Sequence, residues 1–209
     1  MGPRISAGID ACRRFRWRCT WATLTPALLL VLCGCTTTIV PPARVADPQP
    51  VFVLDHGRHT SLVLPHPDGL VRYAYGDWRW YALEDTGVSQ GMAALLWPTR
   101  GTLGRRVLAA PATEEGVRRS VGVVVEHLYM IQAEGTRVAA LRAQLEGLFT
   151  ANRATRTYSA ASDLEFVHHP DGYSAFNNSN HMLADWLKAL GCDIRGSAMF
   201  ARWELVAPR

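Results

Sequence analysis

The first 35 residues restrict most strongly what this chain can fold into. Five arginines and a single acidic residue lie in the first 18 positions, and an apolar stretch from Trp21 to Leu32 follows at once. A basic region followed by a short apolar region is the pattern of a secretory signal peptide. The stretch is too short for a membrane-spanning helix, which needs roughly 20 apolar residues. We therefore expect this segment to be removed, so that the residues after it build the fold.

The end of the apolar stretch indicates where the signal is cut. Leu32-Cys33-Gly34-Cys35 resembles the lipobox of bacterial lipoprotein signals, with Cys33 as its one imperfect element. The resemblance implies a signal peptide over 1–34, cleavage before Cys35 and lipid attachment to that cysteine, which makes the membrane a partner. Thr36, in place of an aspartate, favours the outer membrane, facing the periplasm, by resemblance to sorted lipoproteins. A plain secretory signal or a tail anchor with incidental cysteines is the alternative.

Charge and cysteine content narrow the function of the remaining chain. The whole chain has 22 basic and 18 acidic residues, and removal of the first 35 takes five and one of them, leaving 17 of each. A formally neutral protein without a basic stripe is not expected to bind nucleic acid. Cys192 is then the one cysteine besides Cys35, so no disulfide framework is predicted. We expect Cys192 to be an inert, buried or partly buried thiol.

The chain after the anchor is divided by composition into a linker and one domain. Residues 35–50 are rich in threonine and proline and have no apolar periodicity, which predicts a lipidated cysteine followed by a flexible, extended tether. The remaining residues, 51–209, are enough for a single domain with its own core.

Short apolar runs bounded by turn residues predict the strands of this domain. Val51–Leu54, Thr60–Leu64 and Leu70–Tyr75 are typical of a three-strand meander, and Val107–Ala109 of another short strand. The β-branched stretch Val121–Ile131 predicts a central strand.

Apolar spacings of three and four predict the helices, which come later in the chain. Arg137–Phe149 and a segment from about Asn180 to Leu190 both have this spacing, and Gly91–Trp97 could form one or two helical turns. The polar segment between the two long helices carries Tyr158, Phe166 and Tyr173. Strands first and helices later indicate an α+β fold with an antiparallel sheet and packed helices.

Two segments carry residues that could do chemistry. His56-Gly57-Arg58-His59-Thr60-Ser61-Leu62-Val63-Leu64 places a histidine at the mouth of an apolar strand. Tyr173-Ser174-Ala175-Phe176-Asn177-Asn178-Ser179-Asn180-His181 is a polar turn that leads into a helix start.

On these segments the chain resembles the domain-of-unknown-function 2459 family, uncharacterised envelope proteins that are often lipoproteins and often encoded near urease genes. HGRHTSLVLP, YAYGDWRWY, the helix before Phe149 and YSAFNNSNHMLADWLKALG lie in the family's order, over nearly all of the mature chain. The family's last segment usually reads Asn-Thr-Cys-Asn-Thr-Trp. An early strand histidine paired with a late helix-start cysteine looks like a circularly permuted, NlpC-type, papain-like cysteine hydrolase, a class that acts on cell wall or lipid.

The resemblance implies a catalytic pair and a third residue. Ser179 matches the position of the nucleophilic cysteine and His59 that of the base, while Asp77 is the candidate that would orient the histidine, in competition with Glu84 and Asp85. A cysteine at a helix N-terminus is activated by the helix dipole and by a nearby histidine. A serine hydroxyl is essentially never ionised and needs a better-placed base. Ser179, Asn178 or Asn177 could instead simply be the N-cap that satisfies the first amides of the helix.

The sequence therefore leaves two functions open. The first is a degenerate relative of papain-like hydrolases that binds a cell-wall or lipid component, or a protein partner, without turnover. The second is a weak Ser-His hydrolase or acyltransferase. His56 and His59 are three residues apart, but no third ligand lies at a recognisable zinc spacing, and we predict neither a metal nor a cofactor. Five aromatic residues could line a substrate groove or lie in the core: Tyr73, Tyr75, Trp78, Trp80 and Tyr81.

Overall fold

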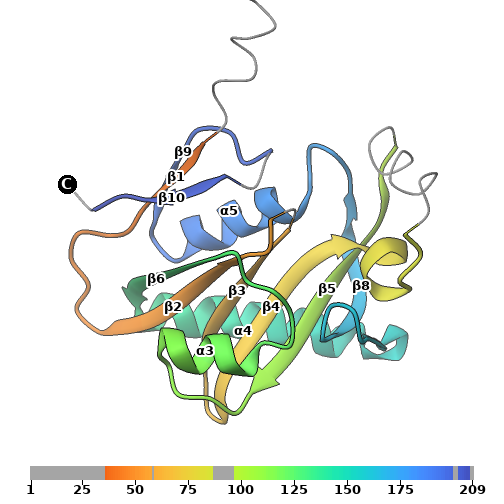
Figure 1. Cartoon of the computed structure of the whole chain (residues 1–209), viewed down its shortest axis with the longest axis horizontal. Coiled ribbons are helices and arrows are strands. Elements are labelled where there is room, and N and C mark those ends of the chain that lie inside the picture. Colours follow the sequence, from red (N-terminus) through yellow and green to blue (C-terminus); the bar gives the residue numbers. More distant parts are fainter. Residues whose placement is uncertain (1–35, 58, 87–96, 200–201, 208–209) are drawn as a thin grey trace, which may run out of the picture. The chain divides into compact units, whose positions relative to one another are not determined.

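A seven-stranded antiparallel sheet forms the centre of the protein (Figure 1). The computed structural model describes residues 36–57, 59–86, 97–199 and 202–207. The strands follow the spatial order β6-β2-β3-β4-β5-β8-β7. Their bounds are β2 Pro48–Asp55, β3 Thr60–His66, β4 Gly69–Asp77, β5 Thr99–Leu108, β6 His127–Glu134, β7 Thr157–Ser159 and β8 Leu164–Tyr173.

The predicted meander is confirmed by β2, β3 and β4, which pair in sequence order. The strand predicted at Val107–Ala109 belongs to the longer β5. The prediction of a central strand over Val121–Ile131 is wrong, because β6 begins at His127 and lies at an edge of the sheet. Val121 instead packs against the helix before it, so its apolar side chain is buried without strand pairing.

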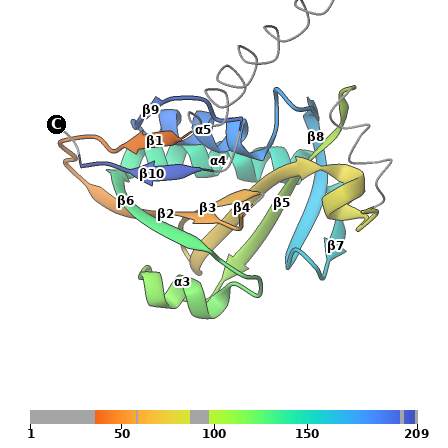
Figure 2. The same ribbon diagram turned by 45° about the horizontal axis from the view of Figure 1, so that its top comes forward.

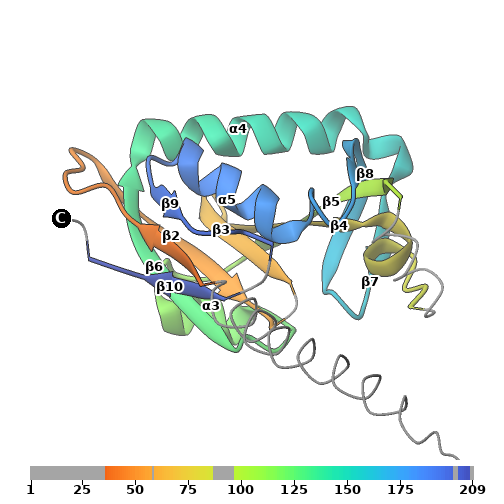
Figure 3. The same ribbon diagram turned by 90° about the horizontal axis from the view of Figure 1, so that it is seen from above.

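Helices cover both faces of the sheet (Figure 2). The two long helices, α4 (Gly135–Ala151) and α5 (Ser179–Ala189), pack on one face and lie side by side (Figure 3). The short helix α3 (Glu114–Ser120) packs on the other. Both long helices confirm the predicted apolar spacing, whereas the helical turns expected at Gly91–Trp97 fall almost wholly outside the described residues. A π-helix, η1 (Trp78–Ala82), and a 3-10 turn, η2 (Arg153–Thr155), complete the helical elements described.

The flexible tether predicted up to residue 50 is wrong in part. A second, three-stranded sheet joins β1 (Thr37–Val40) to β9 (Asp193–Arg195) and β10 (Trp203–Leu205). Ile39 is fully buried and packs with Trp203 in the main core. Residues 37–40 and 48–50, which lie in the predicted tether, are therefore part of strands β1 and β2.

The polar segment between the two long helices also forms strands, β7 and β8, so its aromatic residues are partly structural. Phe166 is buried, whereas Tyr158 is 59% exposed.

Cys192 is buried in the core as expected, and burial raises the pKa of its thiol to about 11. A large antiparallel sheet with a few helices is consistent with the predicted α+β class. None of the helices described has both the length and the apolar character to span a membrane.

Candidate functional site

The turn between β2 and β3 brings two histidines together. Gly57 adopts a positive φ of 88°, which glycine accommodates without strain, and the His56 backbone N–H donates to the His59 carbonyl oxygen at 2.9 Å. The two imidazole rings consequently stack, with their centroids 5.1 Å apart. The sequence-predicted base, His59, is thus one of a stacked pair at the mouth of the strand.

A buried hydrogen-bond network holds the first of these histidines. His56 Nδ1 lies 2.7 Å from the Val124 carbonyl oxygen, so Nδ1 carries the proton and Nε2 is the acceptor. Nε2 lies 2.9 Å from Ser61 Oγ and 3.2 Å from Arg72 Nη2. Arg72 Nε also donates to Ser61 Oγ at 3.0 Å, and Arg72 Nη1 to the Ser162 carbonyl oxygen at 3.1 Å.

Both histidines are held in the neutral form. Burial and then the nearby Arg72 cation lower the pKa of His56 to about 4. Burial also lowers the pKa of His59, with further contributions from His56 and Arg72. His59 Nδ1 is buried and has no hydrogen-bond partner among the described residues. An unpaired, neutral nitrogen of this kind is costly to bury, because its lost hydration is not replaced.

Tyr81 of η1 forms the other side of this site. Its ring stacks on His59 with 4.8 Å between centroids. The ring can approach because Gly76 on β4 has no side chain, and a Cβ there would lie 2.3 Å from the tyrosine ring. A cavity of about 160 Å³ opens between these groups. Its lining residues are His56, His59, Arg72, Tyr81, Val123, Val124, Ala161 and Ser162.

The sequence-predicted nucleophile, Ser179, is the first residue of α5 and is buried. Asn178, one residue earlier, is the cap: its Oδ1 accepts from the backbone N–H groups of Asn180 at 3.0 Å and His181 at 3.2 Å. Helix capping, left open by the sequence, is thus carried by Asn178. The backbone N–H groups of Asn180 and His181, at the start of α5, are thereby occupied by this side chain.

The residues that directly follow His59 and Ser179 in the chain are in contact. Thr60 Oγ1 donates to Asn180 Oδ1 at 3.2 Å in the buried interior. Side chains alternate between the faces of a strand, so Thr60 faces α5 whereas Ser61 faces the Arg72 network. The His59 ring lies with that network through His56 and Tyr81. No hydrogen bond between the His59 ring and the Ser179 hydroxyl exists among the described residues.

The candidates for a third catalytic residue each have other partners. Asp77 caps η1 by accepting from the Trp80 backbone N–H at 2.8 Å, and its other oxygen accepts from Thr99 Oγ1. Glu84 accepts from Ser159 Oγ at 2.9 Å, and Asp85 pairs with Arg79 at 2.5 Å. In the part of the chain that the structure describes, none of the three carboxylates hydrogen-bonds to His59.

The predicted aromatic groove is divided between the core and this site. Tyr73 and Tyr75 are buried in the core that faces α4 and α5. Trp78 and Tyr81 pack from η1 against the other face, where the Tyr81 ring lines the cavity. Of the five aromatic residues, Tyr81 is the one that lines this cavity, while Trp78 and Trp80 are partly buried.

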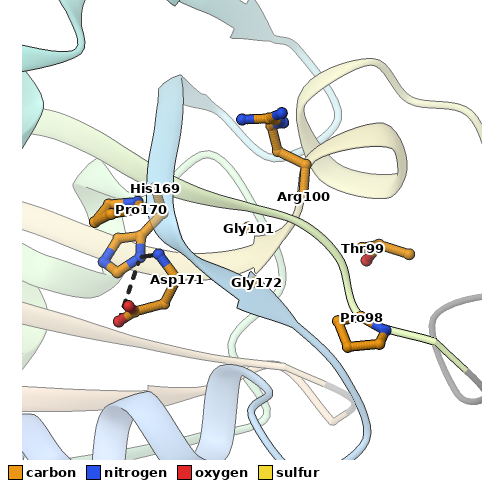
Figure 4. A pocket seen from close by; sticks show the side chains of 8 residues that line it. All are labelled: Pro98, Thr99, Arg100, Gly101, His169, Pro170, Asp171 and Gly172. Atoms are coloured by element: carbon orange, nitrogen blue, oxygen red, sulfur yellow. Dashed lines mark hydrogen bonds and ion pairs between the residues drawn. The ribbon is translucent and has the colours of Figure 1, made fainter.

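A second, more open pocket lies between the start of β5 and the end of β8 (Figure 4). It has a volume of about 320 Å³ and is formed by residues 98–101 and 169–172. The His169 ring accepts from the Asp171 backbone N–H at 3.0 Å, which ties the one aromatic ring among the lining residues to its own strand. Across the described residues, no group of three or more histidine, cysteine, aspartate or glutamate side chains could hold a metal ion.

Sequence reasoning missed Arg72, the residue that organises the site. It is 1% exposed, although it is a charged residue in the middle of β4. The available signal was a single arginine within the apolar run Leu70–Tyr75, at a position that alternation places on the same face as the buried Leu70 and Ala74.

Comparison with known proteins adds no relative: no protein-family model, no curated protein and no solved structure matches the chain.

Proposed function

We propose that this chain is a lipid-anchored protein of the bacterial cell envelope whose domain is a degenerate relative of papain-like hydrolases. In this proposal it binds a cell-wall or lipid component, or a protein partner, without turnover. Cys35 carries the lipid, and the domain faces the periplasm from the outer membrane. The proposed location of the protein rests on the sequence motifs. The proposed loss of catalysis rests on the start of α5.

The single observation that carries the binding function is the capping of α5 by Asn178. Its side-chain oxygen holds the backbone N–H groups of Asn180 and His181, beside the position that matches the family's nucleophile. An oxyanion hole requires donors that are free to meet the developing charge. A serine at position 179 with no hydrogen bond to a described base, next to occupied amides, supports binding rather than turnover.

One observation favours the alternative, a weak Ser-His hydrolase or acyltransferase. The Thr60–Asn180 hydrogen bond fixes the residues that directly follow His59 and Ser179 against each other. In this alternative the His59 side chain must leave its stack with His56 and Tyr81 and turn toward the serine. In this alternative Ser179 is the nucleophile, His59 is the base and Asp77 orients the histidine.

Covalent probes distinguish the two functions. The full chain, purified in a mild detergent, is treated with a fluorophosphonate and with a thiol-directed acyl probe, and the labelled peptide is identified by mass spectrometry. The binding proposal predicts no label on Ser179 in the wild type and labelling in Ser179→Cys, because a thiol is a few per cent ionised near neutral pH. Fluorophosphonate labelling of wild-type Ser179, lost in Ser179→Ala, would establish the hydrolase instead.

A matched control tests whether the position itself activates a thiol. Ser159 on β7 is as deeply buried as Ser179 but lies away from a helix start. Ser159→Cys should remain unlabelled under conditions that label Ser179→Cys. Equal labelling of both variants would remove the support for a hydrolase-like site at the start of α5.

The anchor is tested separately. Cells that produce the wild type should incorporate labelled palmitate into the chain and retain it in the membrane fraction. Cys35→Ser should abolish the incorporation of palmitate, and Cys33→Ser should leave it unchanged. Incorporation of palmitate into Cys35→Ser would contradict the lipoprotein assignment.

A further inference from the structure

Arg72 is a buried cation with no acidic partner among the described residues. Its side chain is 1% exposed, and its three hydrogen-bond partners are a hydroxyl, a carbonyl oxygen and a neutral imidazole. Burial lowers the pKa of its guanidinium to about 10, so the group stays charged at neutral pH. Buried charges in proteins are normally paired, because removal from water is costly.

The hydrogen bonds of Arg72 leave part of its donor capacity unused. A guanidinium has five N–H groups in a planar fork. Three of them reach Ser61, Ser162 and His56, which leaves two N–H groups without a partner among the described residues. Arginine forks of this kind bind carboxylates and phosphates through paired, charge-assisted hydrogen bonds.

The surroundings of Arg72 form a cavity that suits such an anion. Arg72 lines the 160 Å³ cavity together with two histidines that are neutral and carry no competing charge. Val123, Val124 and Ala161 contribute apolar walls, which lower the local polarity and strengthen electrostatic attraction. The volume equals that of about five water molecules at roughly 30 Å³ each, enough for a single anionic group but not for a large substrate.

We propose that this cavity binds a small anionic oxygen group, a carboxylate or a phosphate, on the guanidinium of Arg72. The fork supplies the charge and the direction of the hydrogen bonds, the network of Ser61 and His56 holds the fork in place, and Tyr81 with the valines closes the sides. The site is independent of Ser179 and of the start of α5, so it stands whether or not the domain is a hydrolase relative.

Calorimetric titration of the full chain with sodium phosphate and, separately, with sodium acetate tests this site. The wild type should bind one equivalent of at least one of the two anions, and the anion that binds identifies the source as phosphate or carboxylate. Arg72→Met should weaken this binding by about tenfold or more, because charge-assisted hydrogen bonds are lost. Arg72→Lys, which keeps the charge but not the fork, should lose less.

Arg105 supplies a matched control for loss of charge. It lies on β5 on the other side of the same sheet and is paired with Glu146 at 2.7 Å, so Arg105→Met should bind the anion as the wild type does. Ala161 lines the cavity from an exposed position, so Ala161→Phe should block binding without disturbing the Arg72 network, even if Arg72→Met fails to fold. Absence of binding of both anions to the wild type, or equal binding to the wild type and Ala161→Phe, would overturn the proposal.

Discussion

The two faces of the seven-stranded sheet are built from the same strands and yet have different contents. Toward α4 and α5, the strands present a continuous apolar core that includes Leu62, Leu64 and Tyr73. Toward α3 and η1, the alternate positions of β3 and β4 present Ser61 and Arg72 between smaller apolar clusters. Alternation along one strand thus separates a face that stabilises the fold from a face that holds a buried polar network.

Two arginines show this difference most directly. Arg105 faces α4 and forms an ion pair with Glu146, which also accepts from the Tyr73 hydroxyl. Arg72 lies on the neighbouring strand, faces the other way and has only neutral partners among the described residues. A buried cation without a counter-ion is expected at a site that binds an anion. A cation that is paired with a carboxylate of the same protein is expected where its role is structural. The α3 face is therefore the place to look for function.

The largest effect should come from replacing one buried leucine by alanine on each face of the sheet. Leu187 on α5 and Leu70 on β4 are both fully buried. Leu187→Ala should reduce the free energy of unfolding by about 3 to 4 kcal/mol, within the 2 to 5 kcal/mol typical of buried leucines. Leu70→Ala should reduce the free energy of unfolding by less, about 2 kcal/mol. The cluster that contains Leu70 is smaller than that of Leu187 and can collapse into the space that the lost side chain leaves. Urea unfolding measures both, and a greater loss at Leu70 would reverse the comparison.

The second effect is a loss of stability at acidic pH, which we expect from His56 in the polar network of the α3 face. The pKa of His56 is lowered to about 4 by burial and by Arg72, while a histidine in the unfolded chain titrates near 6.5. Below pH 6.5 the unfolded chain binds a proton that the folded protein does not. The stability contributed by neutral His56 is therefore fully present above pH 6.5 and is lost as the pH falls toward 4, by up to about 1.4 kcal/mol per pH unit.

Urea unfolding at a series of pH values between 7 and 4 measures this loss. His56→Gln replaces the ring with a side chain that does not titrate, so the variant should lose less stability than the wild type over this range. Carboxylates that titrate in the same range affect both proteins equally and cancel in the difference. Parallel curves for the two proteins would mean that His56 binds its proton over the same pH range in the folded and the unfolded state, and would contradict the lowered pKa.

The apolar face could be predicted from the sequence because its pattern is local. The meander over β2 to β4 and the stripes of α4 and α5 follow periods of two and three to four residues that a short window contains. Strand β1 could not be predicted, because the four residues Thr37–Val40 pair with β9 and β10 more than 150 residues later in the chain. A segment that gains its order from such distant partners carries little signal of its own.

The candidate site could be predicted only in part. His59 was singled out because it lies at the mouth of an apolar strand and matches the base of the family that the chain resembles. Ser179 was singled out because it matches the position of that family's cysteine. Arg72 was missed, because its burial depends on the loops at Val124 and Ser162 that close over it. Alternation along β4 places Arg72 on the face of Leu70 and Ala74, but its covering by distant loops is a tertiary property that no local period encodes.

A third effect, smaller than the first two, concerns the start of α5 on the apolar face. Asn178→Ala removes the oxygen that caps two backbone N–H groups and should reduce the free energy of unfolding by about 1 kcal/mol. Asn178→Asp keeps a capping oxygen but loses the amide group that donates to the Ala175 and Met199 carbonyl oxygens, so it should recover only part of this loss. Chemical unfolding of the three proteins gives the comparison. No change in Asn178→Ala would mean that the two N–H groups are satisfied equally well without the Asn178 oxygen, and that the cap does not stabilise α5.

The smallest effect is also the one that separates a structural from a catalytic His59. The ring stacks between His56 and Tyr81 and buries Nδ1 without a partner among the described residues. His59→Phe keeps the stacking and removes the unpaired nitrogen, so it should raise the free energy of unfolding by about 1 kcal/mol. If His59 is instead a catalytic base, His59→Phe should abolish any labelling of Ser179. Stabilisation measured by thermal unfolding, with unchanged probe labelling, would show that His59 belongs to the polar network of the α3 face. A loss of stability would mean that Nδ1 makes a hydrogen bond in solution, and the catalytic alternative would gain support.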